Sequence, residues 1–249
     1  MKVIDVHAHY GRWFFPILAD RVSDMVALME RNGIERCVLS STLAVVYDFA
    51  EGNEELARDI QGHPELFGYV TVNPNYVDAS IEQIDHFLVR PSFVGLKIHP
   101  DYTGQPADHE GNVRILEHVA GAYEGACILI HTWGVEGVHA VAKMTSQFPE
   151  LKFIWGHMGG TSDWRLAAQR VGEFENGYLE ICSSTPEQGK IQEAVAIAGP
   201  EKILFGSDMT LLNPAFVLGT VMDAEIPEVA KQCILYENAQ RVFKFEERG

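Results

Sequence analysis

The stretch Val3-Ile4-Asp5-Val6-His7-Ala8-His9 has the character of a short buried strand that ends in two histidines. Residues two apart on a β-strand point to the same face, so His7 and His9 can bind one cation together. Later strand-like runs also end in polar residues, namely His99, His131, His157 and Asp208. The first run therefore predicts a metal site that distant parts of the chain complete.

Eight short runs rich in β-branched residues recur along the chain at fairly even spacing. They cover residues 3–9, 36–42, 67–73, 93–99, 127–132, 152–158, 178–183 and 203–208. Helix-like segments with apolar residues at helical spacing lie between the runs. These segments cover residues 22–32, with Gly33 as a C-cap, and then 53–61, 80–88, 111–122, 135–148, 164–174, 186–198 and 228–243.

This alternation indicates βαβ units and a parallel sheet. Eight units in 249 residues favour a (β/α)8 TIM barrel over an open doubly wound sheet. The open sheet would need a glycine-rich fingerprint after its first strand, and His7-Ala8-His9-Tyr10-Gly11 is not one. No linker or low-complexity tract divides the chain, so we expect residues 1–249 to form a single α/β domain.

The composition narrows the range of partners. A formal net charge of −16 disfavours nucleic acid and anionic membrane surfaces. The four scattered cysteines indicate buried free thiols in a reducing compartment. The first strand begins at Val3, and no apolar run has the length of a membrane span, so neither a signal peptide nor a membrane anchor is expected. We expect a cytoplasmic protein with a small-molecule substrate, and a homo-oligomer is compatible with the sequence.

The carboxyl ends of all eight strands of such a barrel meet at one mouth. We expect Asp5, His7 and His9 to share one face of the first strand, opposite Val6 and Ala8. Imidazole and carboxylate groups at a concave mouth suit a divalent cation, with Zn²⁺ as the first choice and Mn²⁺ as the second. Water bound to such a cation can ionise near neutral pH and attack a substrate.

A series of ordered motifs extends over nearly the whole chain. The motifs are Asp5-Val6-His7-Ala8-His9, His63-Pro64-Glu65-Leu66-Phe67-Gly68 running to Val72-Asn73-Pro74, Gly95-Leu96-Lys97-Ile98-His99-Pro100, His131-Thr132-Trp133, Gly156-His157-Met158-Gly159-Gly160, Phe205-Gly206-Ser207-Asp208 and Glu237-Asn238-Ala239-Gln240-Arg241-Val242-Phe243. The set resembles the amidohydrolase superfamily, within it the amidohydrolase-related group that includes the aminocarboxymuconate-semialdehyde decarboxylase relatives. Each motif is short, but the ordered set is specific.

The resemblance implies roles for five residues. It assigns His7, His9, His131 and Asp208 as metal ligands, with Asp208 also the general base on a metal-bound water. It makes His157 a group that polarises the substrate or supports the ligands. A carboxylate that touches both metal and water can accept the water's proton, and a nearby imidazole can stabilise a developing oxyanion. Asp5, one layer below the histidines, is expected to orient an imidazole.

Lys97 leaves two alternatives open. In binuclear members of the superfamily, a lysine on the fourth strand carries a carbamate that bridges two metals, and Lys97, His131 and His157 match that arrangement by position. The other alternative is an interior ammonium paired with Asp5, Glu180 or a metal-bound carboxylate. The motifs resemble the mononuclear group more closely, so one ion is favoured over two. His99 is expected to bind substrate, to support a ligand through a hydrogen bond, or to be a ligand itself.

Residues that follow the strand ends are candidates for the substrate pocket, because loops on this face build the pocket of a barrel enzyme. These candidates are Arg12, Trp13, Tyr102, Trp133 and Arg165. Arg12 or Arg165 could bind a substrate carboxylate through two parallel hydrogen bonds. Pairing of these arginines with surface carboxylates is an equally good interpretation.

Three functions remain in order of preference. The first is a metal-dependent hydrolase that acts on an amide, lactone or ester bond of a small substrate, with or without a carboxylate. The alternative is a metal-dependent non-oxidative decarboxylase of an aromatic or enoic acid, in which Asp208 or His157 delivers a proton to carbon. The short segment between His9 and the first helix counts against this alternative, because decarboxylase relatives tend to have larger insertions. The third is a non-catalytic binding protein on the same scaffold, which predicts a missing ligand.

Overall fold

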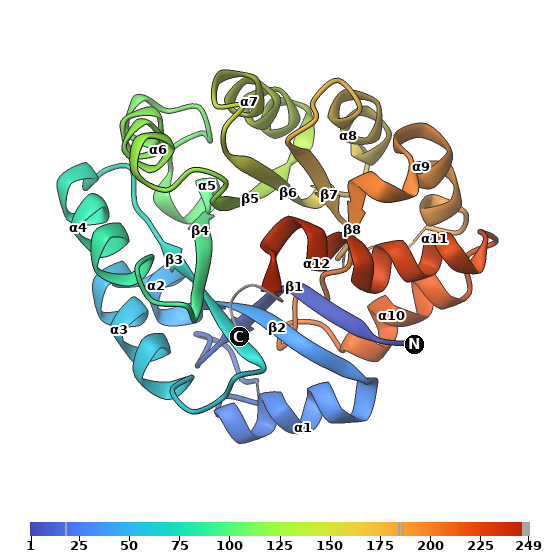
Figure 1. Cartoon of the computed structure of the whole chain (residues 1–249), viewed down its shortest axis with the longest axis horizontal. Helices are drawn as coiled ribbons and strands as arrows, with labels where there is room; N and C mark the ends of the chain where they lie inside the picture. Colours follow the sequence, from blue (N-terminus) through green and yellow to red (C-terminus); the bar gives the residue numbers. More distant parts are fainter. Residues whose placement is uncertain (18, 184, 186, 246–249) are drawn as a thin grey trace.

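A computed structural model of the chain describes residues 1–17, 19–183, 185 and 187–245. Eight parallel strands pair in chain order and form one sheet. The strands are β1 (Val3–Tyr10), β2 (Ile34–Ser41), β3 (Leu66–Thr71), β4 (Phe93–Ile98), β5 (Cys127–Trp133), β6 (Lys152–Gly159), β7 (Gly177–Glu180) and β8 (Ile203–Leu204). Their helices form a ring around the sheet (Figure 1).

Helices of this ring lie between successive strands and after β8. The helices are α1 (Val22–Asn32), α2 (Thr42–Val46), α3 (Phe49–Asp59), α4 (Val77–Phe87), α5 (Pro100–Thr103), α6 (Glu110–Ala122), α7 (Gly134–Gln147), α8 (Trp164–Val171), α9 (Lys190–Ala198), α10 (Pro214–Met222), α11 (Glu228–Gln232) and α12 (Asn238–Phe243). A 3₁₀ turn, η1 (Pro200–Lys202), precedes β8, and a π-helical turn, η2 (Cys233–Glu237), joins α11 to α12.

The segment that follows β8 closes the barrel against β1. The backbone N–H of Val6 donates to the carbonyl of Phe205 at 3.0 Å, and the N–H of Asp208 donates to the carbonyl of His7 at 2.8 Å. Ala8 forms a parallel bridge with Met209. These contacts carry the chain from β8 past the end of β1 and place Asp208 beside the first strand.

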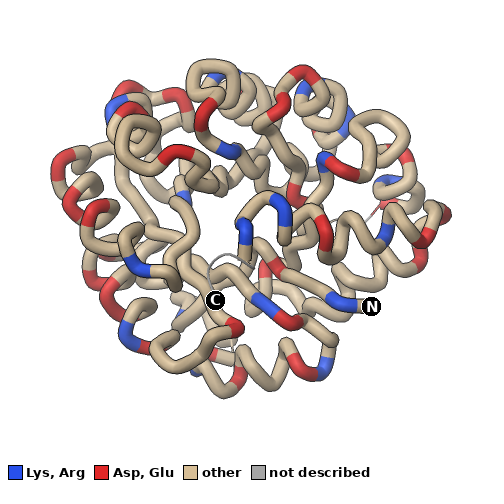
Figure 2. The backbone as a smooth tube through the Cα atoms, viewed as in Figure 1, with Lys and Arg blue, Asp and Glu red and all other residues tan. Residues whose placement is uncertain are grey.

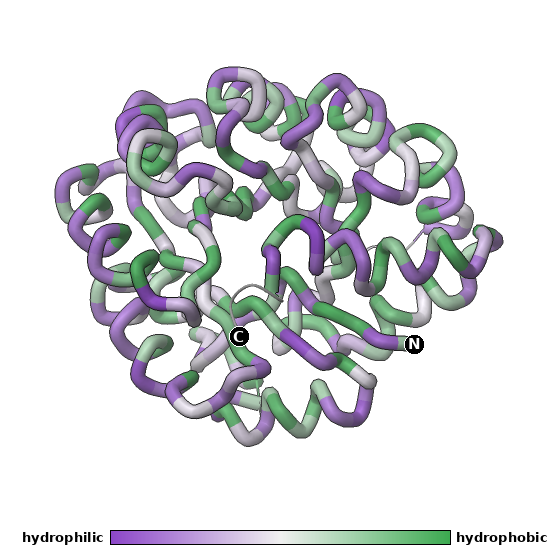
Figure 3. The backbone as a smooth tube through the Cα atoms, in the orientation of Figure 1, coloured by the Kyte–Doolittle hydropathy of each residue, from purple (hydrophilic) through white to green (hydrophobic). Residues whose placement is uncertain are grey.

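Two apolar cores support the barrel. A larger core lies between the strands and the surrounding helices and includes Leu39, Leu96 and Trp155 from the strands. A smaller core fills the barrel interior and joins strand residues to the carboxyl-terminal helix α12. The hydropathy colouring shows the hydrophobic strands inside a ring of helices that alternate hydrophobic and hydrophilic residues (Figure 3).

The helix α12 covers one end of the barrel (Figure 1). Phe245 packs on Phe67 with ring centroids 4.7 Å apart, and Phe243 lies 6.3 Å from Tyr69. Phe67 lies near the start of β3, so α12 closes the amino-terminal end of the barrel. The carboxyl ends of the strands remain as the open mouth.

The predicted (β/α)8 barrel is confirmed, and α1 with its Gly33 C-cap has the predicted bounds. Two strands, β7 and β8, are shorter than predicted by two residues or more. β8 ends at Leu204 rather than at residue 208, because the chain leaves the ladder with β7 and turns toward β1. β7 ends at Glu180 rather than at residue 183. The first residue of the helix predicted at 186–198 lies outside the described residues, and the rest of it begins later, at Lys190.

Three helices, α2, α5 and α10, have no counterpart in the prediction. The helix α10 starts at Pro214 with Asn213 as its N-cap, and its apolar run Ala215-Phe216-Val217-Leu218 shows no helical alternation that periodicity could detect. The single helix predicted for 228–243 is interrupted by the π-helical turn η2.

The predicted faces of the first strand are wrong in one respect. Val6 lies in the barrel interior, whereas Ala8 lies in the outer core. The pairing of β1 with β2 shifts register between Asp5 and Ala8, so simple alternation does not hold across this part of the strand.

Charged residues lie mainly on the outer helices (Figure 2). In the part of the chain that the structure describes, no helix combines the length and apolarity needed to cross a membrane. Cys37, Cys127 and Cys182 are buried, and Cys233 is partly exposed. Burial of the three strand-associated thiols agrees with their prediction as small apolar core residues.

Candidate metal centre and active site

Three predicted ligands converge at the open mouth of the barrel. His7 and His9 come from β1, and Asp208 comes from the segment after β8. Asp208 Oδ1 lies 3.2 Å from His9 Nε2 and 3.7 Å from His7 Nε2. All three residues are buried. The structure therefore brings together side chains that are about 200 residues apart in sequence, because the segment after β8 packs against the first strand.

The geometry of this trio fits a divalent cation. Ligand atoms bound to one ion at about 2.0–2.2 Å lie roughly 3.0–3.7 Å from each other, and the two measured separations are close to that range. Among the residues that the structure describes, Asp208 Oδ1 and His9 Nδ1 are buried without a hydrogen-bond partner. A buried carboxylate oxygen that lacks a partner is costly, and a cation at this position would satisfy it.

The electrostatics of the trio give the protonation states that metal binding needs. Burial lowers the pKa of His7 and His9, so both imidazoles are neutral at neutral pH. Burial alone would raise the pKa of Asp208, but the neighbouring His9 and His7 outweigh it and lower this pKa below the usual range. Neutral imidazole and ionised carboxylate are the forms that bind a cation.

The fourth predicted ligand, His131, lies in an adjacent group. Its Nε2 is 3.3 Å from Asp101 Oδ2, and its ring stacks on His99 with centroids 4.1 Å apart. His131, His99 and Asp101 form a second set of ligand atoms that could hold a cation. The His131 ring also contacts the His157 ring at 4.5 Å, and His157 contacts His7 at 4.9 Å. His131 thus belongs to the same mouth without joining the trio directly.

Lys97 is fully buried beside the trio. Its Nζ lies 2.8 Å from His7 Nε2, the atom that faces Asp208. Burial lowers the pKa of Lys97 to about 8, so a fraction of the amine is neutral near physiological pH. Of the partners predicted for an interior ammonium, neither Asp5 nor Glu180 is the near contact, since His7 occupies that position.

The carboxylate that orients His7 is Glu180 rather than Asp5. Glu180 Oε2 accepts a hydrogen bond from His7 Nδ1 at 2.7 Å, which leaves Nε2 as the atom that faces the trio. Asp5 instead accepts from the backbone N–H groups of His7 and Ser207 and from the Ser207 hydroxyl. Asp5 therefore fixes the backbone that carries the ligands.

Sequence reasoning gave Glu180 only as a partner of Lys97, and it gave Cys182 and Asp101 no role. Glu180 is an acidic residue inside the apolar run Tyr178-Leu179-Glu180-Ile181, and that is the one signal that could have pointed to it. Cys182 Sγ lies 2.9 Å from Glu180 Oε2 and 3.1 Å from His157 Nδ1. The thiol thus bridges the orienting carboxylate and the predicted catalytic imidazole.

Gly206 makes this close approach possible. A Cβ atom at Gly206 would lie 2.4 Å from Glu180 Oε1 and 2.7 Å from His7 Cβ, distances that would force the two side chains apart. The glycine in Phe205-Gly206-Ser207-Asp208 is therefore required by the packing of Glu180 against His7.

The backbone is strained at the mouth. Non-glycine residues with positive φ among those described are His157, Met158, Asp208 and Lys244, and three of these four lie at the mouth. The φ values of His157 and Asp208 are 60° and 58°. Left-handed conformations cost side-chain-bearing residues free energy and concentrate at functional sites. Here they turn the imidazole and the carboxylate toward the centre.

Three of the predicted pocket residues are aromatic and surround the centre. Trp13 packs edge-on against His9 at 5.1 Å, and Tyr102 packs against His99 at 4.6 Å. Trp133 is stacked in parallel with His131 at 6.0 Å. The indole Nε1 of Trp13 is buried without a hydrogen-bond partner. The mouth therefore offers flat apolar surfaces close to the candidate metal ligands.

The two predicted arginines lie in ion pairs instead. Arg12 is exposed and its Nε donates to Asp20 at 2.6 Å. Arg165 pairs with Glu193 at 2.7 Å and with Glu187 at 3.4 Å. The structure does not bring either guanidinium into contact with the histidine cluster, so their role in substrate binding stays a prediction.

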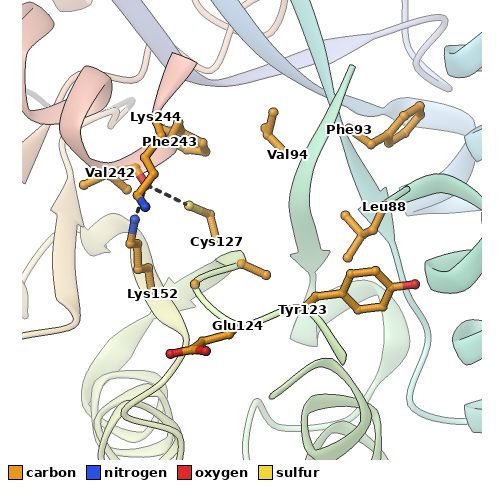
Figure 4. A pocket seen from close by; sticks show the side chains of 12 residues that line it. Leu88, Phe93, Val94, Tyr123, Glu124, Cys127, Lys152, Val242, Phe243 and Lys244 are labelled. Carbon is orange, nitrogen blue, oxygen red and sulfur yellow. Dashed lines mark hydrogen bonds between the residues drawn. The ribbon is translucent and has the colours of Figure 1, made fainter. Parts of the chain in front are cut away.

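Two cavities occupy opposite ends of the barrel. One of about 700 Å³ borders the mouth, and its walls include Asp101, His131 and Trp133. Another of about 470 Å³ lies at the end that α12 covers, between Phe93, Val94, Lys152 and Phe243 (Figure 4). Of these two cavities, only the first has a predicted metal ligand, His131, in its wall, so it is the candidate substrate pocket.

The fold and this cluster define a class of protein: a (β/α)8 barrel with imidazole and carboxylate ligands for a divalent cation at its carboxyl-terminal mouth. A family model described as Amidohydrolase matches residues 4–245. The chain belongs to the amidohydrolase family, and the resemblance inferred from the ordered motifs is confirmed.

The relatives include several decarboxylases. The chain is 26% identical over 298 residues to a gamma-resorcylate decarboxylase of Polaromonas sp. (strain JS666 / ATCC BAA-500), with 92% of this chain and 90% of that protein covered. This alignment is longer than the chain of 249 residues, so the relative carries insertions that this chain lacks.

Solved structures show the same fold. A crystal structure of 2,6-dihydroxybenzoate decarboxylase complexed with 2,6-dihydroxybenzoate superposes with a TM-score of 0.81 at 16% identity, covering 98% of this chain and 99% of the other. A dihydroxybenzoic acid decarboxylase from Polaromonas sp. JS666, with bound manganese and the inhibitor 2-nitroresorcinol, gives 0.77 at 19% identity, covering 99% and 98%. These relatives favour the decarboxylase alternative over the hydrolase that the sequence placed first.

Proposed function

We propose that this protein is a metal-dependent, non-oxidative decarboxylase of a small aromatic carboxylic acid. The observation that carries the proposal is the trio of His7, His9 and Asp208, which offers a cation site bordered by aromatic side chains. The 26% identical relative, which aligns over 92% of this chain and is a gamma-resorcylate decarboxylase, supports the choice of reaction. The substrate would be a small molecule that enters through the mouth of the barrel.

We propose that His7, His9 and Asp208 hold one divalent ion and that His131 joins them from the adjacent group. Zn²⁺ suits these ligands, and the manganese bound by a structural relative supports Mn²⁺ equally. The bound cation would supply positive charge to the oxygens of the substrate. His131 contacts Asp101 in this structure, so its participation requires the imidazole to exchange that contact for the ion.

The side chains of this protein would hold the substrate and move the proton. Trp133 and Tyr102 offer flat faces for an aromatic ring, and the buried Trp13 N–H can donate to a substrate oxygen. In the reaction the bond between ring and carboxylate carbon breaks, CO2 leaves, and the ring carbon gains a proton. Asp208 is placed to take up that proton from the solvent or a substrate hydroxyl and to deliver it, with His157 next to the reacting group.

A direct assay tests the reaction. We expect purified protein loaded with Mn²⁺ or Zn²⁺ to release CO2 from a panel of hydroxylated benzoates that includes 2,6-dihydroxybenzoate, without net addition of water. Water addition to amide, lactone or ester substrates, with no CO2 from any acid of the panel, would replace the proposal with the hydrolase. Protein that binds no divalent ion on titration would indicate a non-catalytic binding protein.

The number of ions is tested through Lys97. We expect one equivalent of metal in the wild type and one in Lys97→Ala, because Lys97 contacts His7 through a hydrogen bond and is not itself needed as a ligand. Elemental analysis of both proteins measures this. Two equivalents in the wild type, falling to one or none in the variant, would instead establish a carbamate bridge on Lys97 between two ions.

A cytoplasmic location and a homo-oligomeric state remain predictions from the sequence. The acidic charge of −16 also predicts that nucleic acid is not a partner. Sedimentation of the purified protein measures the oligomeric state directly.

A further inference from the structure

Glu180 and Cys182, which have no direct role in the mechanism above, form a second buried group with His157 and with His7 of the trio. Glu180 and Cys182 are fully buried, and His157 is nearly so. Their nitrogen, oxygen and sulfur atoms lie close enough together to be considered as a second cation site. Either these atoms hold a cation, or they form a chain of hydrogen bonds, which we call a relay. The distances between the atoms and the number of hydrogens available to them decide between the two.

The distances favour a relay. Glu180 Oε2 lies 2.7 Å from His7 Nδ1 and 2.9 Å from Cys182 Sγ, and Cys182 Sγ lies 3.1 Å from His157 Nδ1. Ligands bound to one zinc ion at about 2.0–2.3 Å lie farther apart than this, roughly 3.2–3.8 Å. These atoms are therefore at hydrogen-bonding distance and leave no room for an ion between them.

Glu180 acts as an acceptor on both of its oxygens. The backbone N–H of His157 donates to Oε2 at 3.2 Å, and the backbone N–H of Cys182 donates to Oε1. Because backbone N–H groups can only donate, both oxygens accept. His7 Nδ1 and the Cys182 thiol also reach Oε2, so each of them brings a hydrogen to the carboxylate.

The hydrogen count then fixes the tautomer of His157. A thiol carries one hydrogen, and a charge-assisted bond to a carboxylate is the stronger use of it. With the S–H directed to Glu180, the sulfur can only accept from His157, so the hydrogen of that contact belongs to Nδ1.

We propose that Cys182 is a positioning residue that couples Glu180 to His157 and holds His157 in the tautomer protonated at Nδ1, with Nε2 bare. Glu180 thereby orients two imidazoles, His7 directly and His157 through the thiol. A bare Nε2 makes His157 a hydrogen-bond acceptor for a substrate hydroxyl rather than a donor to an oxyanion. This use of His157 rests on the proposed function, whereas the tautomer itself does not.

The tautomer is measured without any substrate. Long-range ¹H–¹⁵N correlation spectra of the zinc-loaded, ¹⁵N-histidine-labelled protein separate the two neutral tautomers, and a His157→Gln spectrum identifies the His157 signals. We expect His157 to be protonated at Nδ1 in the wild type and in Cys182→Ser, whose hydroxyl can also donate and accept. In Cys182→Ala we expect His157 no longer to be held in that single tautomer. Protonation at Nε2 in the wild type, or no change in Cys182→Ala, would overturn the proposal.

Cobalt substitution tests whether the thiol is a metal ligand instead. A thiolate-to-cobalt charge-transfer band that is present in the wild type and absent in Cys182→Ala would show ligation and overturn the relay. We expect no such band and the same metal stoichiometry in both proteins. Cys37→Ala is the matched control, because it removes another fully buried thiol from the outer core.

Kinetics extends the test if the enzyme decarboxylates the panel acids. We expect Cys182→Ala to lower kcat by about 10–100-fold, the range typical for partners that orient active-site groups, and Cys182→Ser to recover most of it. Equal loss in both variants would show that bulk rather than hydrogen bonding matters, against the proposal. A wild type with the Nδ1-protonated tautomer but without activity would overturn the proposed function alone.

Discussion

The two ends of the barrel differ in how their buried groups are packed. Helix α12 covers the amino-terminal end, whereas the carboxyl end is the open mouth. At the covered end, Phe243 and Phe245 fill the interior against aromatic residues of β3. At the mouth, buried polar atoms of His9, His99 and Asp208 have no hydrogen-bond partner within the described part of the chain. The two ends share the same eight strands, so the difference comes from the side chains placed there.

Within one domain, the covered end therefore contributes mainly to stability and the mouth mainly to function. Burial of aromatic rings contributes to folding, whereas unpartnered polar groups and left-handed backbone at His157 and Asp208 reduce stability. Proteins retain such costly features where a ligand satisfies them. Truncation of the aromatic residues at the covered end should therefore lower stability and leave metal binding intact, whereas changes to the trio at the mouth should weaken metal binding.

The largest expected effect comes from Asp208→Asn at the mouth. The amide keeps the size of the side chain but removes the charge that would offset a cation and the carboxylate that we propose as the proton-transfer group. We expect weaker metal binding and a fall in CO2 release of about 10²–10⁴-fold, the range for loss of a general acid or base. Elemental analysis and the decarboxylation assay measure the two effects. Wild-type metal content together with wild-type activity would contradict the assignment of Asp208.

The second-largest expected effect comes from a change at the covered end. Phe243→Ala empties part of the interior core, and we expect the free energy of unfolding to fall by about 3–5 kcal/mol. Urea denaturation of the metal-free protein measures it. Phe216→Ala on α10, whose side chain is 43% exposed, is the control and should change stability by less than about 0.5 kcal/mol. Loss of metal binding in folded Phe243→Ala protein would show that the two ends are not independent.

The sequence was sufficient to predict the barrel and to name the three residues that meet in the trio. Strand–helix alternation gave all eight strands, and the motif around Asp208 named it as a candidate ligand even though its strand ends at Leu204. The reason is that periodicity and motifs are local features. Register is not local, so the shift between Asp5 and Ala8 that separates the faces of Val6 and Ala8 could not be foreseen.

The side chains that support the site could not be predicted from the sequence, for a related reason. Glu180 and Cys182 come from β7 and the loop that follows it, and their contacts with His7 depend on how closely the strands approach across Gly206. Likewise, Asp101 reaches His131 only because the short helix α5 turns the chain back toward the mouth. Such contacts depend on three-dimensional packing, which residue spacing does not encode.

The smallest expected effect concerns Lys190, at the start of α9 on the mouth side. Its buried ammonium has no hydrogen-bond partner among the described residues and lies 6.0 Å from the ring centroid of Trp164. Its positive charge lies at a helix amino terminus, where the helix dipole disfavours it. We expect Lys190→Met to raise the free energy of unfolding by about 1 kcal/mol, near the lower end for removal of an unsatisfied buried group. Lys202→Met is the matched control and should destabilise the protein, because Lys202 donates to the carbonyls of Phe174 and Glu175.

The pH dependence of this pair identifies the charge as the cause. Burial lowers the pKa of Lys190 in the folded protein, whereas the unfolded chain keeps the ordinary value of 10.5. Between these two values the unfolded state binds more protons, so the stability of the wild type rises with pH across that window. Lys190→Met lacks this rise, and its advantage should shrink as urea titrations move from pH 7 to pH 10. An advantage that stays constant over this range would mean that apolar packing, and not the buried charge, stabilises the variant.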